Sequence, residues 1–228
     1  MKKNWNIRRI PADYEGLSRK FKLDPVTVRI LVNRGVDTEE KIEAYFSEDE
    51  SIFDHARGLP DYDKALEALH SFRERNLRVR IIGDYDIDGV CATAILLKGL
   101  SRFGLNVDSV IPHRVLDGYG MNKNLIEQAH ADGIGGIITC DNGIAAKEEV
   151  DLAVKLGMEV IVTDHHEVPE ELPNAVAVVD QKRKENRYPN REICGAYVAY
   201  KVIAGLLEGN KEEEDLRLRE ELLVLAGF

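Results

Sequence analysis

Short apolar runs alternate with longer amphipathic stretches from residue 63 onward, and this alternation predicts the secondary structure. Strands are predicted at residues 78–83, 107–111, 135–140, 158–163 and 175–179. Helices are predicted at residues 63–76, 90–103, 122–131, 144–156 and 195–207. Strands that alternate with helices of about 10–15 residues are typical of βαβ units. The pattern therefore predicts an α/β domain over residues 63–228, with a parallel sheet flanked by helices.

The first 62 residues follow a different pattern and predict short helices. Asp24-Pro25 opens one helix that Gly35 ends, and Asp37-Thr38 precedes another. Residues 47–62 are polar and contain glycine and proline, which is typical of a linker. We therefore expect residues 1–62 to form a small N-terminal helical region and linker that precede the α/β domain.

Three of the predicted strands run directly into acidic or histidine residues. The three motifs are Asp84-Tyr85-Asp86-Ile87-Asp88-Gly89, Asp141-Asn142-Gly143 and Asp164-His165-His166. Ligand sites of open α/β sheets lie outside the carboxyl ends of the strands. The sequence therefore predicts a metal-dependent site to which all three strand ends contribute.

The first motif has both a functional and a plain structural interpretation. Asp86 and Asp88 are two residues apart, so in an extended loop their carboxylates can share one or two cations. Gly89 permits a tight backbone, and the helix that starts there would favour a phosphate at its N-terminus. The alternative is an acidic surface turn or a calcium loop. An EF-hand is excluded, because Ile95 stands where its glutamate is required.

The other two motifs differ in how readily they are explained without a ligand. Asp141-Asn142 could simply cap the following helix. Asp164-His165-His166 follows a buried strand, where polar groups must be paired, so only a capped turn with a satisfied histidine competes with a metal site. Imidazole and carboxylate together suit Mn, Zn or Fe. The three motifs combined favour a dinuclear site.

His113-Arg114 follows the strand at 107–111 on the same sheet edge. An arginine there could clamp a phosphate with two hydrogen bonds. A surface ion pair with Asp117 explains the arginine equally well.

Composition sets the cellular context. The chain has 228 residues, of which 44% are hydrophobic, enough for a full-sized core. We expect no membrane association, because no apolar stretch approaches the roughly 20 residues of a membrane span. Three scattered cysteines and the lack of a signal-peptide pattern favour reduced thiols in the cytoplasm. The net charge of −10 argues against a nucleic-acid coat protein, but the clustered carboxylates contribute to it.

Taken together, the segments GDYDIDG (83–89), CDNGI (140–144) and TDHHE (163–167) resemble the DHH phosphoesterases, in particular the RecJ-type single-stranded-DNA exonucleases. The segments LVNRGVDTEEKIEAYF (31–46) and ICGAYVAYKV (193–202) are similar to RecJ-type segments as well. The resemblance implies 5′-to-3′ removal of mononucleotides from single-stranded DNA in DNA repair and recombination. It also implies two Mn²⁺ or Mg²⁺ ions, with single-stranded DNA and replication or repair proteins as partners.

The resemblance also implies roles for individual residues. The metal ligands would be Asp84, Asp86, Asp88, Asp141 and His165. His166 would face the scissile phosphate, with Asp164 as its catalytic neighbour. The residues that contact phosphate or DNA would be His113, Arg114 and Gly89. Two cations would stabilise the attacking and leaving oxygens of an in-line displacement at phosphorus.

The chain departs from the family pattern near its end. The pattern expects a further ligand aspartate some sixty residues after His166, about where Phe228 ends the chain. Of the later aspartates, Asp215 lies in an acidic segment and Asp180 follows the strand at 175–179, and we expect neither to replace it. We therefore expect an N-terminal portion that stops before the last metal-ligand motif.

Two rival functions remain open from the sequence. One is a DHH phosphodiesterase of short oligoribonucleotides or cyclic dinucleotides. The other is a non-catalytic fragment that binds DNA or replication partners. The N-terminal helices and the GDYDIDG segment favour the exonuclease over the first, and the retained ligand residues favour it over the second.

Overall fold

Two units make up the chain, residues 1–54 and residues 55–228. The computed structural model describes residues 10–47, 56–113, 120–209 and 212–227. Ala56 and Leu59, which the sequence pattern places in a linker, are buried in the core of the larger unit. None of the described helices is both long and apolar enough to cross a membrane.

The smaller unit contains three short helices, of which the sequence pattern located the two that follow Asp24-Pro25 and Asp37-Thr38. They are α1 (Tyr14–Phe21), α2 (Pro25–Asn33) and α3 (Glu39–Tyr45). The side chains of Asp13, Asp24 and Thr38 each accept a backbone N–H at a helix start, which satisfies donors that a helix leaves unpaired. Their apolar faces form one small core, built from Leu17, Val28, Leu31, Val32 and Ile42.

The larger unit is built around a five-stranded parallel sheet, which confirms the predicted α/β class. The strands are β1 (Arg78–Ile82), β2 (Asn106–Val110), β3 (Gly136–Cys140), β4 (Glu159–Thr163) and β5 (Ala177–Val179). Their order in the sheet is β2-β1-β3-β4-β5. The chain moves outward from β1 to β2 and then returns past β1, so the direction of strand addition reverses between β1 and β3.

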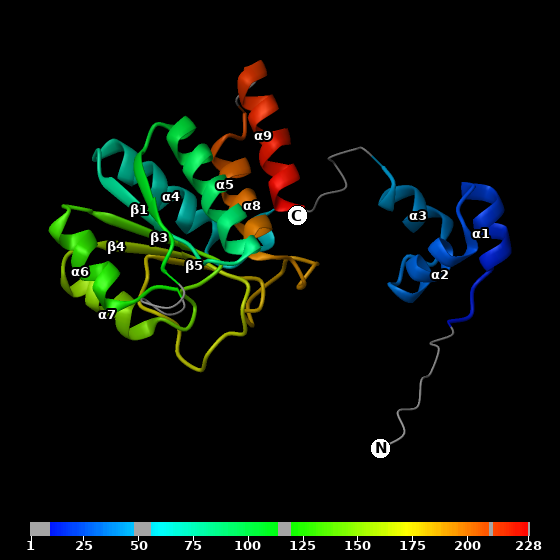
Figure 1. Cartoon of the computed structure of the whole chain (residues 1–228), viewed down its shortest axis with the longest axis horizontal. Coiled ribbons are helices and arrows are strands. Elements are labelled where there is room, and N and C mark those ends of the chain that lie inside the picture. Colours follow the sequence, from blue (N-terminus) through cyan, green and yellow to red (C-terminus); the bar gives the residue numbers. More distant parts are fainter. Residues whose placement is uncertain (1–9, 48–55, 114–119, 210–211, 228) are drawn as a thin grey trace. The chain divides into compact units, whose positions relative to one another are not determined.

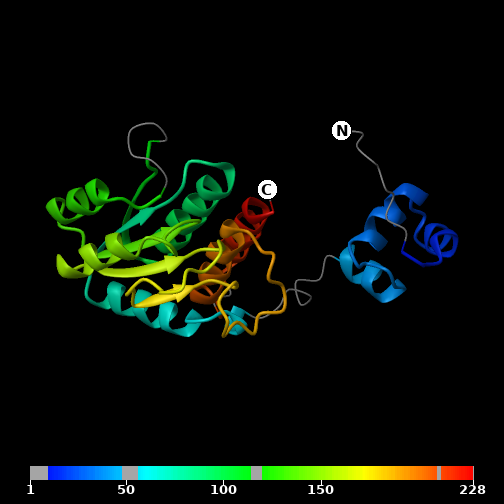
Figure 2. The ribbon, with the colours of Figure 1, turned by 90° about the horizontal axis from the view of Figure 1, so that it is seen from below.

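Helices cover both faces of this sheet (Figure 1). They are α4 (Tyr62–Glu74), α5 (Ile87–Phe103), α6 (Lys123–Ala131), α7 (Lys147–Lys155), α8 (Gly195–Leu206) and α9 (Glu213–Ala226), with a 3₁₀ turn at Ala56–Gly58. The helices α4, α5 and α8 pack on one face, and α6 and α7 pack on the other. Figure 2 shows α4 running alongside β5, and Figure 1 shows α9 on the outer side of α5 and α8.

Alternation along the strands divides the core into two layers. In β1, Val79 and Ile81 join the layer under α5 and α8, whereas Ile82 joins the layer under α6 and α7. This period of two is the geometry of a strand buried on both faces. Gly99 allows α5 and α8 to approach closely, because a Cβ there would lie 2.3 Å from Cγ2 of Ile203.

Two helices, α5 and α7, begin more than one residue away from their predicted starts. Helix α5 begins at Ile87, not at residue 90, because Asp86 acts as its N-cap and accepts the N–H of Gly89 at 3.0 Å. Helix α7 begins at Lys147, not at residue 144. Residues 144 and 145 form a turn instead, closed by the N–H of Ala146 donating to the carbonyl of Gly143 at 3.1 Å. The N–H of Ile144 donates to the side chain of Asp164.

Candidate metal centre

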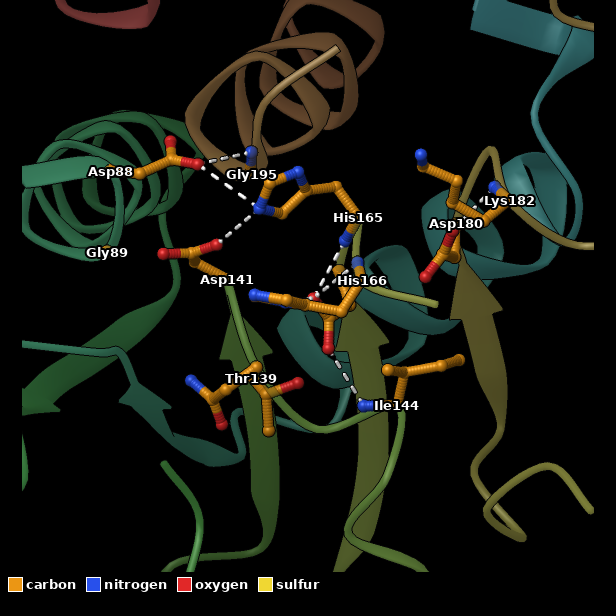
Figure 3. Close-up of polar contacts among 12 residues, drawn as sticks. Asp88, Gly89, Thr139, Asp141, Ile144, His165, His166, Asp180, Lys182 and Gly195 are labelled. Carbon is orange, nitrogen blue, oxygen red and sulfur yellow. Dashed lines mark hydrogen bonds and ion pairs between the residues drawn. The ribbon is translucent and has the colours of Figure 1, made fainter. Parts of the chain in front are cut away.

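The candidate site lies at the edge of the sheet where strand order reverses. Asp84 follows β1 and Asp141 follows β3, the two strands on either side of the reversal. In open α/β sheets this crevice is where ligands bind. The histidine pair follows the next strand, β4, and Figure 3 shows both imidazoles directed toward Asp141.

Three carboxylates form a first group. Asp84, Asp86 and Asp141 each place an oxygen within 4.8 Å of the others. Asp84 is buried, which raises the pKa of its carboxyl group, and its Oδ1 has no hydrogen-bond partner within the described part of the chain. Gly89 lets α5 pass over Asp84, because a Cβ there would lie 2.6 Å from the Asp84 carbonyl oxygen. A buried, unsatisfied oxygen among like charges is a favourable environment for a cation.

Asp141 and the two histidines form a second group, again with ligand atoms within 4.8 Å of one another. Nε2 of His165 lies 2.9 Å from Oδ1 of Asp141. This hydrogen bond raises the pKa of His165, while burial raises the pKa of Asp141 to about 6. Asp141 belongs to both groups, so one carboxylate joins the acidic and the histidine sides of the site.

Asp164 holds the histidine loop in place. Its Oδ1 accepts the backbone N–H of His165 at 2.7 Å and that of His166 at 3.3 Å, and it lies 2.7 Å from Nδ1 of His166. Its Oδ2 accepts the N–H of Ile144 at 2.9 Å, which ties the loop after β3 to the loop after β4. The hydrogen bond that Nδ1 of His166 donates to Asp164 raises the pKa of His166 to about 9. Without bound metal, His166 is therefore protonated at neutral pH, with Nδ1 held by Asp164.

Asp88 joins the site to helix α8. Its two oxygens accept the N–H groups of Gly195 and Ala196 at 2.8 and 2.7 Å, and Oδ2 also lies 3.4 Å from Nε2 of His165 (Figure 3). A carboxylate at a helix N-terminus is favourable, because it satisfies free N–H groups and meets the positive end of the helix dipole. Asp88 is not a member of either group that the described residues form.

The donor set fits divalent cations. Carboxylate oxygens suit Mg²⁺ and Mn²⁺, and imidazole nitrogens add affinity for transition metals. The described carboxylates around Asp141 also repel one another, since Asp86 and Asp88 both raise its pKa. Bound positive charge would remove that repulsion.

The residues predicted to contact phosphate are less well assembled. His113 is exposed after the end of β2, and Arg114 lies outside the described residues. The N–H of Gly89 donates to Asp86 and not to a ligand. The absence of a side chain at Gly89 allows the close approach to Asp84 described above.

Two buried polar residues at this edge of the sheet, Asn142 and Asp180, were not assigned to the site from the sequence. Asn142 donates to the carbonyls of Ile82 and Cys140 at 3.1 and 2.9 Å, and accepts the N–H of Met121 at 3.2 Å. Asp180, just after β5, is fully buried, and burial raises its pKa to about 7. Its position after an apolar strand was the available signal, and the same signal had identified Asp84, Asp141 and Asp164.

A parallel α/β sheet with carboxylates and imidazoles at its reversal point defines an α/β domain with a candidate metal centre. Residues 78–227 match the model of the DHH family, N-terminal domain. The chain therefore belongs to the DHH family, and the predicted membership is confirmed.

Similar proteins carry the RecJ name. The chain is 34% identical over 228 residues to the single-stranded-DNA-specific exonuclease RecJ of Bacillus subtilis (strain 168), a match that covers 100% of this chain and 28% of the relative. It is 32% identical over 207 residues to RecJ of Escherichia coli (strain K12), covering 90% of this chain and 35% of the relative. The chain thus spans about a third of the length of these curated relatives.

Solved structures agree with the fold. A crystal structure of exonuclease RecJ bound to manganese matches with a TM-score of 0.63 and 31% identity, covering 73% of this chain and 43% of the other. RecJ from Thermus thermophilus in complex with Mn²⁺ has a TM-score of 0.66 at 24% identity, covering 92% of this chain and 30% of the other. The second likeness shows the fold alone.

Proposed function

We propose that this chain catalyses the metal-dependent hydrolysis of phosphodiester bonds in single-stranded DNA. The products would be mononucleotides released in the 5′-to-3′ direction, in DNA repair and recombination in the cytoplasm. One observation carries the proposal: the acidic and histidine groups meet at the shared carboxylate of Asp141, at the reversal point of the sheet. Similarity to exonucleases named for single-stranded DNA supports the choice of substrate.

The cation ligands follow from the two groups. Asp84, Asp86 and Asp141 would hold one Mn²⁺ or Mg²⁺ ion. Asp141 and His165 would hold a second, with Asp88 close to the same imidazole. When bound, such a pair supplies the positive charge that stabilises the attacking and leaving oxygens in an in-line displacement at phosphorus.

His166 would face the scissile phosphate. Its positive charge, sustained by Asp164, would attract the phosphate oxygens and stabilise the charge that builds on them. Asp164 itself is occupied by four hydrogen bonds, so its role is to position His166 and the neighbouring loop. The exposed His113 and its neighbour Arg114 would contact the DNA backbone.

The test is cleavage of 5′-labelled single-stranded DNA with and without Mn²⁺, using the wild-type chain, His165→Ala and Asp86→Ala. Each substitution should lower the rate of cleavage by about tenfold to a hundredfold, which is the usual effect of disturbing a metal site. Matched controls are His130→Ala and Asp63→Ala, which change an exposed histidine and an exposed first-turn aspartate away from the site. Both controls should cleave as the wild type does.

The same assay separates the rival functions. Faster cleavage of dinucleotides than of long DNA would favour a phosphodiesterase of short oligonucleotides. Mn²⁺ binding and DNA binding without any cleavage would favour a non-catalytic binding fragment. Cleavage that persists in both site variants would contradict the assignment of the metal centre.

A further inference from the structure

The connection between β5 and α8 is strongly basic, although the chain as a whole is acidic. Residues 182–191, here called the basic segment, carry five cationic side chains and one carboxylate, whereas the whole chain has a net charge of −10. The five cations are Lys182, Arg183, Lys184, Arg187 and Arg191. A local concentration of positive charge on an acidic protein indicates a place where a polyanion can bind.

The basic segment contains no helix or strand, yet it is anchored to the domain at two points. Arg183 is buried, and its Nη1 lies 2.6 Å from Oδ2 of Asp61. The backbone N–H of Arg187 donates to the carbonyl of Gly58 at 2.9 Å. Arg183 therefore serves as an anchor, and the remaining cations project from a fixed backbone. Such preorganisation lowers the entropic cost of binding a ligand.

Three cations on this surface are available for a ligand. Lys184 and Arg187 are exposed, and neither forms an ion pair within the described part of the chain. Arg57, in the adjoining 3₁₀ turn, is exposed and likewise has no ion pair with the residues described. A phosphate that binds these side chains therefore displaces no carboxylate.

Lys182 connects the basic segment to the metal centre. It lines a pocket of about 360 Å³ together with the two histidines, and Figure 3 shows it across the histidine pair from Asp141. It also lines a second pocket, of about 410 Å³, together with Arg183 and Lys184. The positive charges thus begin at the metal centre and continue away from it.

Four glutamates also line these two pockets, and all four are exposed. They are Glu167, Glu170, Glu185 and Glu192. Nζ of Lys182 lies 3.4 Å from carboxylate oxygens of both Glu167 and Glu192, whose side chains are 89% and 82% exposed. Ion pairs with such exposed partners are weak, so both glutamates can turn into water when a phosphate takes their place at Lys182.

The position of Lys182 favours a nucleic acid strand over an acidic peptide as the ligand. A strand that has one phosphate at His166 carries further phosphates at regular intervals, and these can meet the cations that lead away from the centre. Arg57 and Arg187 can each donate two N–H groups to one phosphate. An acidic peptide has no group that would continue into the metal centre.

We propose that the basic segment and Arg57 bind the sugar–phosphate backbone of the part of the strand that has yet to be cleaved. Lys182 contacts the phosphate next to the one at His166, and Lys184, Arg187 and Arg57 contact phosphates further along. The inference rests on the proposed function, because it takes the scissile phosphate to lie at His166. It makes the chain prefer strands of several nucleotides over dinucleotides.

Fluorescence anisotropy tests the inference with a labelled single strand of about 12 deoxythymidine nucleotides, without divalent cations and over a range of NaCl concentrations. In the double variant Lys184→Ala/Arg187→Ala, the slope of log Kd against log[NaCl] should fall by about 1.4, which is about 0.7 for each lost phosphate contact. Binding at low salt should weaken about tenfold or more. Both side chains are exposed, so the variant should melt as the wild type does.

The matched control is Lys155→Ala/Arg217→Ala, which removes two exposed cations from α7 and α9 and changes the net charge equally. It should keep the wild-type slope and affinity. Equal slopes in the two double variants would overturn the surface, as would a wild type that binds the strand no tighter than a dinucleotide. A polyglutamate peptide that displaces the strand at equal charge would assign the surface to an acidic protein and overturn the nucleic acid.

Cleavage in the presence of Mn²⁺ is measured separately. Lys184→Ala/Arg187→Ala should raise KM for the strand, whereas the control pair should leave it unchanged. A wild type that binds the strand through this surface but cleaves nothing would count against the proposed function alone, because the binding titrations contain no metal.

Discussion

Asp164 and Asp180 are two buried aspartates at the ends of neighbouring strands, and their side chains differ in how many hydrogen bonds they accept. Their exposed fractions are 1% and 0%. Asp164 uses both oxygens in four hydrogen bonds. Asp180 accepts one N–H, from Lys182 at 2.6 Å, and its Oδ2 has no hydrogen-bond partner among the residues described. The supply of donors, and not the degree of burial, decides whether a buried carboxylate stabilises its surroundings.

The largest expected effect is that of Asp164→Asn, because it removes the charge on which the histidine loop depends. The asparagine amide cannot accept from both Ile144 and Nδ1 of His166, so at least one buried donor loses its partner. We expect the rate of DNA cleavage to fall about tenfold to a hundredfold. The free energy of unfolding should fall by about 2–4 kcal/mol.

An NMR titration of His166 distinguishes positioning from general destabilisation. Without metal, the pKa of His166 should fall from about 9 toward the ordinary histidine value of about 6.5 in Asp164→Asn. A pKa that stays near 9 in the folded variant would contradict the role assigned to Asp164.

The same substitution at Asp180 should act in the opposite direction. The pKa of this carboxyl is about 7 in the folded protein and close to 3.8 in the unfolded chain. At pH values between these two, the carboxyl therefore takes up a proton when the protein folds. Ionisation then costs stability as the pH rises from about 4 to about 7, and the cost is constant above that. Asp180→Asn removes this cost. The variant should therefore be more stable than the wild type by at most about 4 kcal/mol at pH 8.

Denaturant unfolding at pH 5 and pH 8, without divalent metal, measures this difference. The advantage of Asp180→Asn over the wild type should be larger at pH 8 than at pH 5. An equal difference at the two pH values would mean that Asp180 does not titrate in this range, and the contrast with Asp164 would then fail.

The contrast also shows where sequence reasoning succeeds. Apolar runs located all five strands. The signal is strongest in β3, where all five residues are buried, and weakest in the edge strand β2, where Asn106, Asp108 and Ser109 interrupt the apolar pattern. Polar residues just after those strands marked Asp84, Asp141 and the histidine pair, since parallel strand ends share one edge. These inferences need only local pattern and the rules of sheet topology.

Interactions between distant residues could not be read from that pattern. Asp215 lies in an acidic segment of the sequence, yet it is 1% exposed and pairs with Arg102 of α5. Asp88 meets Gly195, which is 107 positions away along the chain. Each of these contacts depends on where a helix packs, and neither has a local sequence signal.

The smallest expected effect is that of a substitution at Gly195, which contacts both Asp88 and Asp141. A Cβ at this position would lie 2.7 Å from Oδ1 and 2.8 Å from Cβ of Asp141. Gly195→Ala should therefore push α8 away from Asp141 and loosen the contact with Asp88. We expect a loss of about 1–3 kcal/mol in the free energy of unfolding, typical of overpacking, together with weaker Mn²⁺ binding.

Gly227→Ala is the matched control, because its added Cβ would be no closer than 3.5 Å to another atom. Calorimetric titration with Mn²⁺ and thermal unfolding should separate the two variants. Asp164→Asn disturbs the histidine side of Asp141, whereas Gly195→Ala disturbs the helix side, so both should weaken the same metal centre from opposite directions. If Gly195→Ala bound Mn²⁺ as tightly as the control, the helix side would not contribute to the site. Asp88 would then serve only to cap α8.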